Sequence, residues 1–275
     1  MYRYLLIILF VCLCYEVSNA SQPSSFYFLK STGIVCVTTP CPSWEINLVN
    51  SQQNSITVHG LNFAPSVNET KVFEAKEDER ILYGYWCNTK VNGQDAVEFK
   101  ILGAHRMIAI DGYGPPRAGD YLSLSYYQWK WVNFPFITGP IVSPPSNPFL
   151  DYPHMDKEWL RDKLYNQDKK HRAIVQATVD TFGKVLVTAI FVSLDDPEQP
   201  CPGIVLIGCD DAHVMTFNRD ANRCVSFDTC VEPGACILSI PVCPKGYNLV
   251  SIPSRPYGCP KHFCDPDFLN LTWDQ

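Results

Sequence analysis

The spacing of the cysteines constrains this chain more than any other feature of its sequence. Eight cysteines fall within residues 201–264. A segment this rich in cysteine has little hydrophobic core of its own, so it depends on crosslinks to fold. Each disulfide typically contributes about 2–4 kcal/mol by restricting the unfolded chain. The sequence therefore predicts a disulfide-rich module over 201–275, with the candidate cysteines Cys201, Cys209, Cys224, Cys230, Cys236, Cys243, Cys259 and Cys264.

Zinc is the alternative use of such a cluster. Zinc sites of this kind favour the spacing C-x2-C, which none of these cysteines shows. An oxidising export route also favours disulfides over free thiolates. We therefore expect no metal and no cofactor.

The upstream cysteines leave one thiol over. Cys36 and Cys41 enclose a short ring stiffened by Pro40, and we expect them to pair with each other. Cys87 then has no partner in its own region. An odd thiol in a secreted chain is either buried and inert or linked to another molecule. We favour the buried thiol, because Cys87 lies beside aromatic residues in a predicted strand.

The first twenty residues have the pattern of a secretory signal peptide. A basic residue, Arg3, precedes a short apolar run, and Ser18 and Ala20 occupy the small-residue positions of a cleavage site. The apolar run is too short to cross a bilayer, which takes about 20 residues, so we expect no membrane span. Two sequons follow, at Asn68 and Asn270, and glycosylation at both fits a secreted, extracellular protein.

The composition narrows the classes of partner. Hydrophobic residues make up 46% of the chain and charged residues 18%, which is the composition of a folded protein. The formal net charge is -6, and no basic cluster is present. Nucleic acid is therefore excluded as a partner, because its binding needs clustered Lys and Arg.

Alternating apolar residues predict a mainly β fold of antiparallel hairpins. Residues 44–48 and 56–58 show the period of two that is typical of half-buried strands. A second hairpin joins 82–91 to 97–101 through Asn92 and Gly93, which favour a type I′ turn. We expect 121–134 to form one long aromatic strand. These strands make up a β-rich domain over 21–134.

A proline-rich stretch follows, and then the predicted helix. Six prolines lie between positions 135 and 153, which indicates a linker or surface crossover. The helix is expected at about 156–170 with Asp156 at its start. Together with a hairpin over 174–192 it forms a unit at 154–200. This hairpin resembles the one at 81–101, so either the two arose by duplication or both follow the ordinary pattern of hairpins.

One segment resembles a known family. The stretch from Phe26 to Asn50 contains an aromatic strand, the motif C-x4-C-P-S from Cys36 to Ser43, and an alternating strand that ends in Asn. It is similar to the opening of an uncharacterised family of secreted domains of unknown function. The hairpin that contains Leu82, Tyr83 and Gly84 and the turn Asn92-Gly93 is similar to the closing element of that family, so the resemblance covers about a third of the chain. It implies a small β-rich domain and no assigned activity.

The tail has a second, shorter resemblance. The motifs that begin at Cys243 and end at Cys264 contain C-P-x-G and G-C-P patterns. They resemble extracellular cysteine modules of the von Willebrand C or antistasin kind. Modules of that kind bind proteins or inhibit proteases, which the resemblance implies as a direction for the function.

Motifs for catalysis are absent from the sequence. It has no G-x-S-x-G, H-E-x-x-H or P-loop pattern. Asn218, Asp220 and Asn222 alternate in the way that the oxygen ligands of a calcium loop do. The Gly and Glu that such a loop also needs are missing, so a polar turn explains these residues better. We interpret Asp210 and His213 as a solvated loop. The dispersed acids Asp195, Asp196 and Asp210 leave an enzyme of unfamiliar type as a third hypothesis.

An aromatic run offers a possible binding surface. Tyr127, Trp129 and Trp131 fall on one face of the predicted strand, where they either stack against a carbohydrate or peptide or pack in the core. Core packing is the favoured interpretation.

The sequence as a whole predicts a secreted glycoprotein without catalytic activity that binds an extracellular protein or carbohydrate. The alternative is a secreted protease inhibitor that presents the cysteine-held segment 251–257, with Arg255 at its centre.

Overall fold

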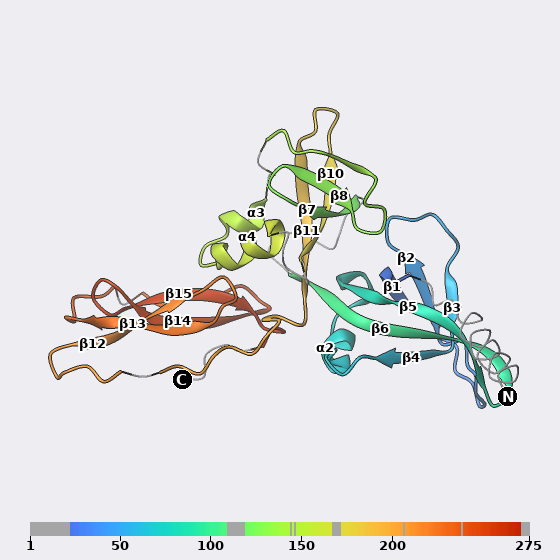
Figure 1. The fold of residues 1–275 in the computed structure, drawn as a ribbon, viewed down its shortest axis with the longest axis horizontal. Helices are drawn as coiled ribbons and strands as arrows, with labels where there is room; N and C mark the ends of the chain where they lie inside the picture. The colour runs from blue at the N-terminus through green and yellow to red at the C-terminus, as the bar shows by residue number, and fades with distance from the viewer. Residues whose placement is uncertain are drawn as a thin grey trace, which may run out of the picture.

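The computed structural model describes residues 23–108, 119–143, 145, 147–166, 172–205, 207–237 and 239–270. The predicted signal peptide lies outside them. The fold is mainly antiparallel β, as predicted. Figure 1 shows three parts: one group of strands on the right, a second at the top, and two separate hairpins on the left. None of the helices in these described residues is long and apolar enough to span a membrane.

The first two groups of strands belong to one sheet of 11 strands, whose order is β3-β2-β1-β5-β6-β11-β10-β7-β8-β9, with β4 paired in parallel to β6. The strands are β1 Ser25–Ser31, β2 Trp44–Leu48, β3 Ile56–Val58, β4 Gly60–Phe63, β5 Arg80–Val91, β6 Gln94–Ile108, β7 Asp120–Leu124, β8 Gln128–Trp131, β9 Thr138–Pro140, β10 Ile174–Val179 and β11 Val185–Ser193. The sheet crosses the predicted boundary at 135–153, because β11 pairs with β6. That proline-rich stretch therefore does not separate two sheets.

The strand order reads the same from either edge. Strands β1, β2, β3, β5 and β6 correspond in turn to β7, β8, β9, β10 and β11. The register agrees: Ile81 lies opposite His105 in the first unit, and Ile174 lies opposite Phe191 in the second. Each pairing then shifts two residues later, after Tyr83 and after Gln176 respectively. Ordinary hairpins do not share flanking strands and bulges, so the sheet consists of two repeats.

A pseudo-two-fold axis relates the repeats. It passes between β6 and β11 at the pair Arg106 and Val192. On either side of it, His105 pairs with Ser193 and Met107 with Phe191. The hairpins make His105 equivalent to Phe191 and Met107 equivalent to Ser193. Replacing each residue by its equivalent therefore turns one of these two pairs into the other. Each repeat therefore contributes its last strand to the same central interface.

Two asparagines close the sheet from opposite sides. Asn50, just after β2, accepts a hydrogen bond from Tyr121 N at 2.8 Å and donates to Tyr121 O at 2.7 Å. Asn133, just after β8, accepts from Phe26 N and donates to Phe26 O, both at 2.8 Å. Phe26 and Tyr121 are equivalent residues of β1 and β7, so the two bridges are reciprocal. Each amide supplies hydrogen bonds to the opposite repeat at the point where the adjacent strand, β2 or β8, has ended.

The closed sheet encloses a core to which both repeats contribute. Its buried residues are Val49, Ile81, Ile174, Ala189 and Phe191, and the partly buried residues Phe26, Phe28, Met107, Tyr121 and Val132 pack against them. A second and larger core lies on the other face, where it includes Trp159, Leu160 and Leu164 of helix α4 (Lys157–Tyr165).

Two predictions about the chain between the repeats were wrong. Residues 121–134 form β7 and β8 instead of one strand, because Ser125 Oγ accepts from Gln128 N at 3.0 Å and closes a tight turn. The stretch 135–153 contains the edge strand β9 and helix α3 (Pro148–Asp151). Proline is tolerated at both places, since an edge strand needs fewer donors and the first helical turn leaves its N–H groups unpaired.

The predicted helix is present but shorter than expected. Asp156 caps its start, with Oδ1 accepting from Trp159 N at 3.1 Å. The helix ends at Tyr165 with Asn166 as its C-cap, and residues 167–171 lie outside the described chain. The prediction of a single helix was also wrong. Helix α2 (Glu69–Glu74), the 3-10 turn η1 (Glu77–Glu79) and α3 are too short to show a helical period.

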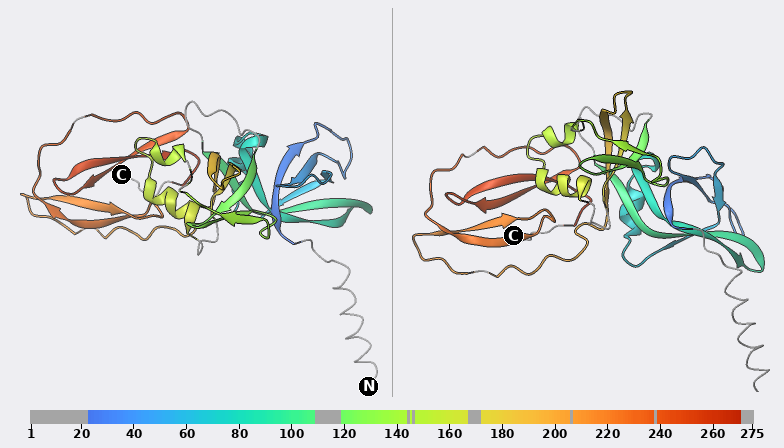
Figure 2. Two further views of the ribbon diagram at one scale, coloured as in Figure 1. Left: turned by 90° about the horizontal axis from the view of Figure 1, so that it is seen from above. Right: turned by 45° about the horizontal axis from the view of Figure 1, so that its top comes forward.

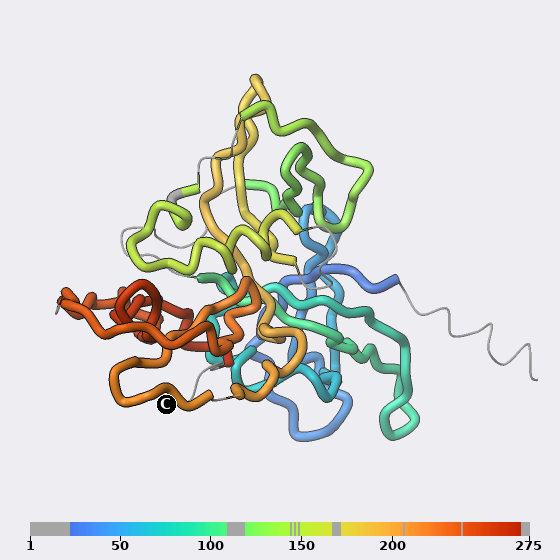
Figure 3. The backbone as a smooth tube through the Cα atoms, turned by 60° about the vertical axis from the view of Figure 1, so that its left-hand side comes forward, coloured from blue at the N-terminus to red at the C-terminus, as the bar shows by residue number. Residues whose placement is uncertain are grey.

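The two remaining sheets are hairpins. One pairs β12 (Val214–Arg219) with β13 (Val225–Val231), and the other pairs β14 (Tyr247–Ser254) with β15 (Cys259–Pro266). Figure 2 shows both hairpins as a lobe beside the main sheet. The tube in Figure 3 places this lobe next to the segment that carries α4.

The reciprocal bridges give a first prediction. We expect Asn50→Ala and Asn133→Ala each to lower the free energy of unfolding by about 1–3 kcal/mol, because each leaves a partly buried backbone N–H of the opposite repeat without its partner and removes one of two hydrogen bonds to the carbonyl of the same residue. Asn88→Ala, at an exposed position of β5, is the matched control and should have no measurable effect. Urea unfolding followed by fluorescence measures all three. Equal stability of the bridge variants and the control would contradict the closure.

Candidate functional site

Five disulfides pair ten of the cysteines. They join Cys36 to Cys41, Cys201 to Cys224, Cys209 to Cys230, Cys236 to Cys259 and Cys243 to Cys264. The four C-terminal bridges have sequence separations of 23 and 21 in the first hairpin and again 23 and 21 in the second. The module thus repeats one unit, in which two bridges tie a leading segment to a hairpin. Disulfide bonding of this chain is confirmed.

Cys87 is unpaired and half-buried on β5. Packing alone therefore does not seal its thiol from a second molecule. Both earlier interpretations, an inert thiol and an intermolecular link, stay open as predictions.

The apolar core of the module is thin. Its buried members are Phe217, Val225, Ile252 and Phe263, which come from both hairpins. Four such side chains supply little of the burial that a domain needs. The disulfides lie where this burial is insufficient, which is the reason that the sequence analysis gave for them.

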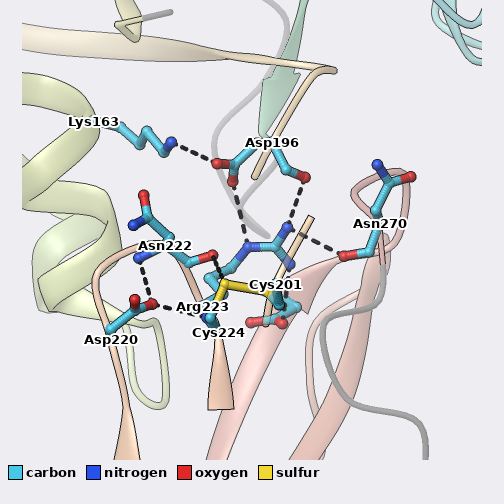
Figure 4. The surroundings of a disulfide bond; sticks show 9 residues. Lys163, Asp196, Cys201, Asp220, Asn222, Arg223, Cys224 and Asn270 are labelled. Carbon is cyan, nitrogen blue, oxygen red and sulfur yellow. Dashed lines mark hydrogen bonds and ion pairs between the residues drawn. A yellow bond between two sulfur atoms is a disulfide. The ribbon is translucent and has the colours of Figure 1, made fainter. Parts of the chain in front are cut away.

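A buried cluster of charges attaches the module to the rest of the chain. Asp196, just after β11, lies 2.5 Å from Lys163 Nζ on α4 and 3.3 Å from Arg223 Nε. It also accepts a hydrogen bond from Trp159 Nε1 at 2.7 Å. All of these side chains are almost completely buried. Figure 4 shows Lys163 and Arg223 approaching Asp196 from different elements, beside the disulfide between Cys201 and Cys224.

The cluster continues toward the second hairpin. Arg219 contacts both carboxylate oxygens of Asp265, at 2.8 and 2.7 Å, and its Nε lies 3.3 Å from Asp156 Oδ2. Arg223 reaches Asp265 as well, at 3.3 Å. Burial raises the pKa of Asp156, and the Arg219 guanidinium opposes that rise. Three cations and three carboxylates thus balance one another between the helix, the end of the sheet and both hairpins.

The largely apolar interior of the main sheet opens into a cavity of about 290 Å³. Its polar groups include Ser123 and His105. His105 is 3% exposed, and its Nε2 lies 3.1 Å from Arg172 O. The lining residues are Phe26, Tyr83, Gly103, His105, Ser123, Val132, Arg172, Ala173 and Ile174. A largely apolar concave space with a few polar groups is the usual form of a small-molecule site.

The predicted aromatic row is not a flat surface. Tyr127 is 83% exposed in the turn between β7 and β8, whereas Trp129 and Trp131 pack against the core. Gly139 lies directly on the Trp129 ring, since a Cβ there would come within 2.7 Å of it. Trp129 and Trp131 therefore have the structural use that the sequence analysis favoured.

A groove of about 300 Å³ lies at the same turn. Tyr126 and Tyr127 line one part of it, and Asp162, Tyr165 and Asn166 line the rest. The Tyr126 ring stacks on Tyr165 with centroids 5.1 Å apart. Sequence reasoning missed this groove, because it depends on the turn that breaks 121–134 into two strands.

The other candidate residues have structural uses. Asp220 Oδ1 accepts from Asn222 N and Cys224 N, both at 2.8 Å, so these residues build the turn between β12 and β13. Asp210 and His213 contact each other at 2.5 Å in an exposed turn, and this contact raises the pKa of His213. In the described part of the chain no three His, Cys, Asp or Glu side chains form a metal site.

The segment proposed for protease inhibition is only partly a loop. Residues 251–254 belong to β14 and pair with β15. Arg255 lies in the following turn, where its Nε is 2.5 Å from Asp228 Oδ2. The expectation of an exposed segment over 251–257 is therefore met only at Arg255, Pro256 and Tyr257, because residues 251–254 are paired and Ile252 is buried.

The fold and site define a mainly β protein made of a duplicated sheet and a duplicated, disulfide-linked hairpin. Residues 6–104 match the family described as a domain of unknown function, DUF6748. The match ends within β6, so it spans the first repeat. An uncharacterised protein of Dictyostelium discoideum is 27% identical over 266 residues, covering 93% of this chain and 91% of that protein. These findings support an uncharacterised domain family, as the N-terminal resemblance implied.

No solved structure matches the chain. The resemblance of the tail to von Willebrand C or antistasin modules is not shown by these comparisons.

The charge cluster gives a second prediction. We expect Arg223→Met to lower the free energy of unfolding by about 3–5 kcal/mol, because it leaves buried carboxylates short of a cation. Lys90→Met, which removes a cation paired with Asp95 at the surface, is the control and should leave stability unchanged. Chemical denaturation compares the two. A small loss for Arg223→Met would show that the cluster does not hold the module.

Proposed function

We propose that this chain is a secreted, disulfide-stabilised glycoprotein without catalytic activity that binds a partner outside the cell. The observation that carries the proposal is the placement of four disulfides in a module whose own hydrophobic cluster has four buried members, Phe217, Val225, Ile252 and Phe263. Such a module needs an oxidising compartment in order to fold. The predicted signal peptide agrees with that requirement.

The sequon asparagines are both accessible. Asn68 is exposed, and its Oδ1 caps α2 by accepting from Lys71 N at 3.1 Å. Asn270 is exposed too, and its Oδ1 accepts from Lys71 Nζ at 2.9 Å. A glycan is attached through the amide nitrogen, and these contacts use only the oxygen. This geometry supports glycosylation at both positions.

The absence of catalysis is proposed from what the reactive side chains do. Ser251 Oγ and His262 Nδ1 lie 2.8 Å apart, which is the distance of a nucleophile and its base. These residues are direct neighbours across β14 and β15, so strand register accounts for their contact. The dispersed acids Asp195, Asp196 and Asp210 do not gather, since Asp196 is buried in the charge cluster and Asp210 is at the surface.

Of the two partner classes, carbohydrate is favoured by the groove at Tyr126 and Tyr127. Exposed aromatic faces stack on the apolar faces of sugars, and neighbouring carboxylate and amide groups bind hydroxyls. Asp162 and Asn166, which are joined by a hydrogen bond of 2.7 Å from Asn166 Nδ2 to Asp162 Oδ1, line the same groove. A protein partner stays the alternative.

The export proposal is tested by expression in eukaryotic cells. We expect the protein in the medium, with a mass that falls after N-glycan removal and with one thiol, Cys87, that reacts after denaturation without reductant. The control lacks residues 1–20, so it should stay in the cytosol and expose several thiols. A native secreted protein with many reactive thiols would contradict the proposal.

The carbohydrate proposal is tested on an array of extracellular glycans. We expect the binding signal of the wild type to fall at least tenfold in Tyr126→Ala combined with Tyr127→Ala, because the stacking faces are removed. Phe182→Ala, which removes another exposed ring in the turn between β10 and β11, should bind like the wild type. A signal that survives the tyrosine changes, or no signal for the wild type, would rule out this groove as the carbohydrate site.

A further inference from the structure

The interior of the main sheet can be compared between the repeats, position by position. The register of the paired strands fixes the equivalences without any sequence alignment. Facing the interior, the equivalent pairs of the first and second repeat are Phe26 and Tyr121, Phe28 and Ser123, Tyr83 and Gln176, Gly103 and Ala189, and His105 and Phe191.

One side of the interior is filled by aromatic rings. Tyr121 lies 5.0 Å from Phe28 and 5.8 Å from Phe191, measured between ring centroids. Its hydroxyl accepts from Gln176 Nε2 at 3.1 Å. Burial raises the pKa of Tyr121 to about 12. This side is therefore closed and well packed.

The opposite side has the same backbone with a different set of side chains: Tyr83 is larger than its equivalent Gln176, whereas three other positions carry smaller or more polar residues. Phe26 takes the place of Tyr121 and lies 5.7 Å from the ring of His105, as Tyr121 lies against Phe191. The position of Phe28 is occupied by Ser123, and that of Ala189 by Gly103. The missing volume is the cavity of about 290 Å³, which Phe26, Gly103, His105 and Ser123 all line.

The filled side shows that this fold can place large aromatic rings in contact at these positions. The cavity is thus a departure from the symmetric arrangement, located at one of two equivalent places. It leaves apolar side chains without the contacts that Phe28 and Phe191 supply on the other side.

The lining determines the chemistry of the occupant. Phe26, Val132, Ala173 and Ile174 give mainly apolar walls, Arg172 also lines the cavity, and among the described lining residues none is acidic. Tyr83, Ser123 and His105 add a few hydrogen-bonding groups. The volume is at the lower end of the range of small-molecule sites.

We propose that the cavity between the repeats binds a small, uncharged, largely aromatic molecule with a hydrogen-bonding group. The aromatic part occupies the space that Phe28 and Phe191 fill on the other side, and the polar group lies near Ser123 and His105. This inference goes beyond the proposed function, which concerns export and a partner at the surface.

The test replaces two residues of the open side with the residues found at the equivalent positions of the filled side. The probe is N-phenyl-1-naphthylamine, an uncharged aromatic amine whose fluorescence rises when it leaves water. We expect saturable binding to the wild type and at least a tenfold loss of affinity in Ser123→Phe combined with His105→Phe. Leu102→Ala, on the exposed face of β6 beside the cavity wall, is the matched control and should bind like the wild type.

A smaller change guards against misfolding of the double variant. A Cβ at Gly103 would meet only Tyr83 Cβ and Cδ1, at 3.8 and 4.0 Å, and its φ lies outside the left-handed region. Gly103→Ala therefore adds one methyl group to the cavity without a clash. We expect its thermal midpoint to stay at or above that of the wild type and its affinity for the probe to fall severalfold.

Each other outcome overturns the proposal. Failure of the wild type to bind the probe would do so, and so would a folded double variant that binds as tightly as the wild type. If the double variant does not fold, unchanged affinity in Gly103→Ala decides against the cavity. The export assay does not involve the probe, so failure here leaves the proposed function intact.

Discussion

The pairing of β6 with β11 is the interaction on which the rest of the structure depends. It joins the last strands of two repeats into one sheet around a pseudo-two-fold axis at Arg106 and Val192. Because each strand is already paired on its other side, both repeats are buried at the join. The two ends of the sheet then come close enough for Asn50 and Asn133 to bridge them. The closed interior, with its filled side and its open side, follows from this one contact.

The C-terminal hairpins are held by different means. Their shared core is small, and covalent bridges restrict their unfolded state. Their attachment to the rest of the chain is both ionic and apolar. Arg219 and Arg223 meet carboxylates from the helix, from the end of β11 and from the second hairpin, and Tyr247, Phe268 and Leu269 are buried in the core that contains α4. A buried ion pair gives little net stability, but loss of one member is costly, so such a cluster fixes geometry. The chain thus combines apolar burial in the sheet with crosslinks and paired charges in the lobe.

The sequence predicted the features that depend on local pattern. Asn92 and Gly93 adopt positive φ angles of 53° and 79°, as the predicted type I′ turn requires, and Asp156 caps its helix. From the sequence, duplication was only one of two interpretations of the similar hairpins. The residues at equivalent inward-facing positions of the two repeats differ, as Phe28 and Ser123 illustrate. The evidence for duplication lies in strand order and register, which no local pattern contains.

The site residues escaped prediction for a related reason. Lys163 could have indicated the charge cluster. It lies four residues after Trp159 on the apolar face of the helix, where a charged side chain needs a buried partner. Its partner Asp196 lies 33 residues away and resembles any loop acid. His105 and Gly103 interrupt an apolar strand, but only comparison with Phe191 and Ala189 shows that they leave space.

Native-state hydrogen exchange, read by mass spectrometry on the disulfide-intact protein, tests the central claim most directly. If β6 and β11 join the repeats into one cooperative sheet, amides of β5 and β6 should exchange with the same opening free energy as those of β10 and β11. Exchange of β10 and β11 at a clearly lower free energy, while β5 and β6 stay protected, would show that the second repeat opens alone and would contradict the account.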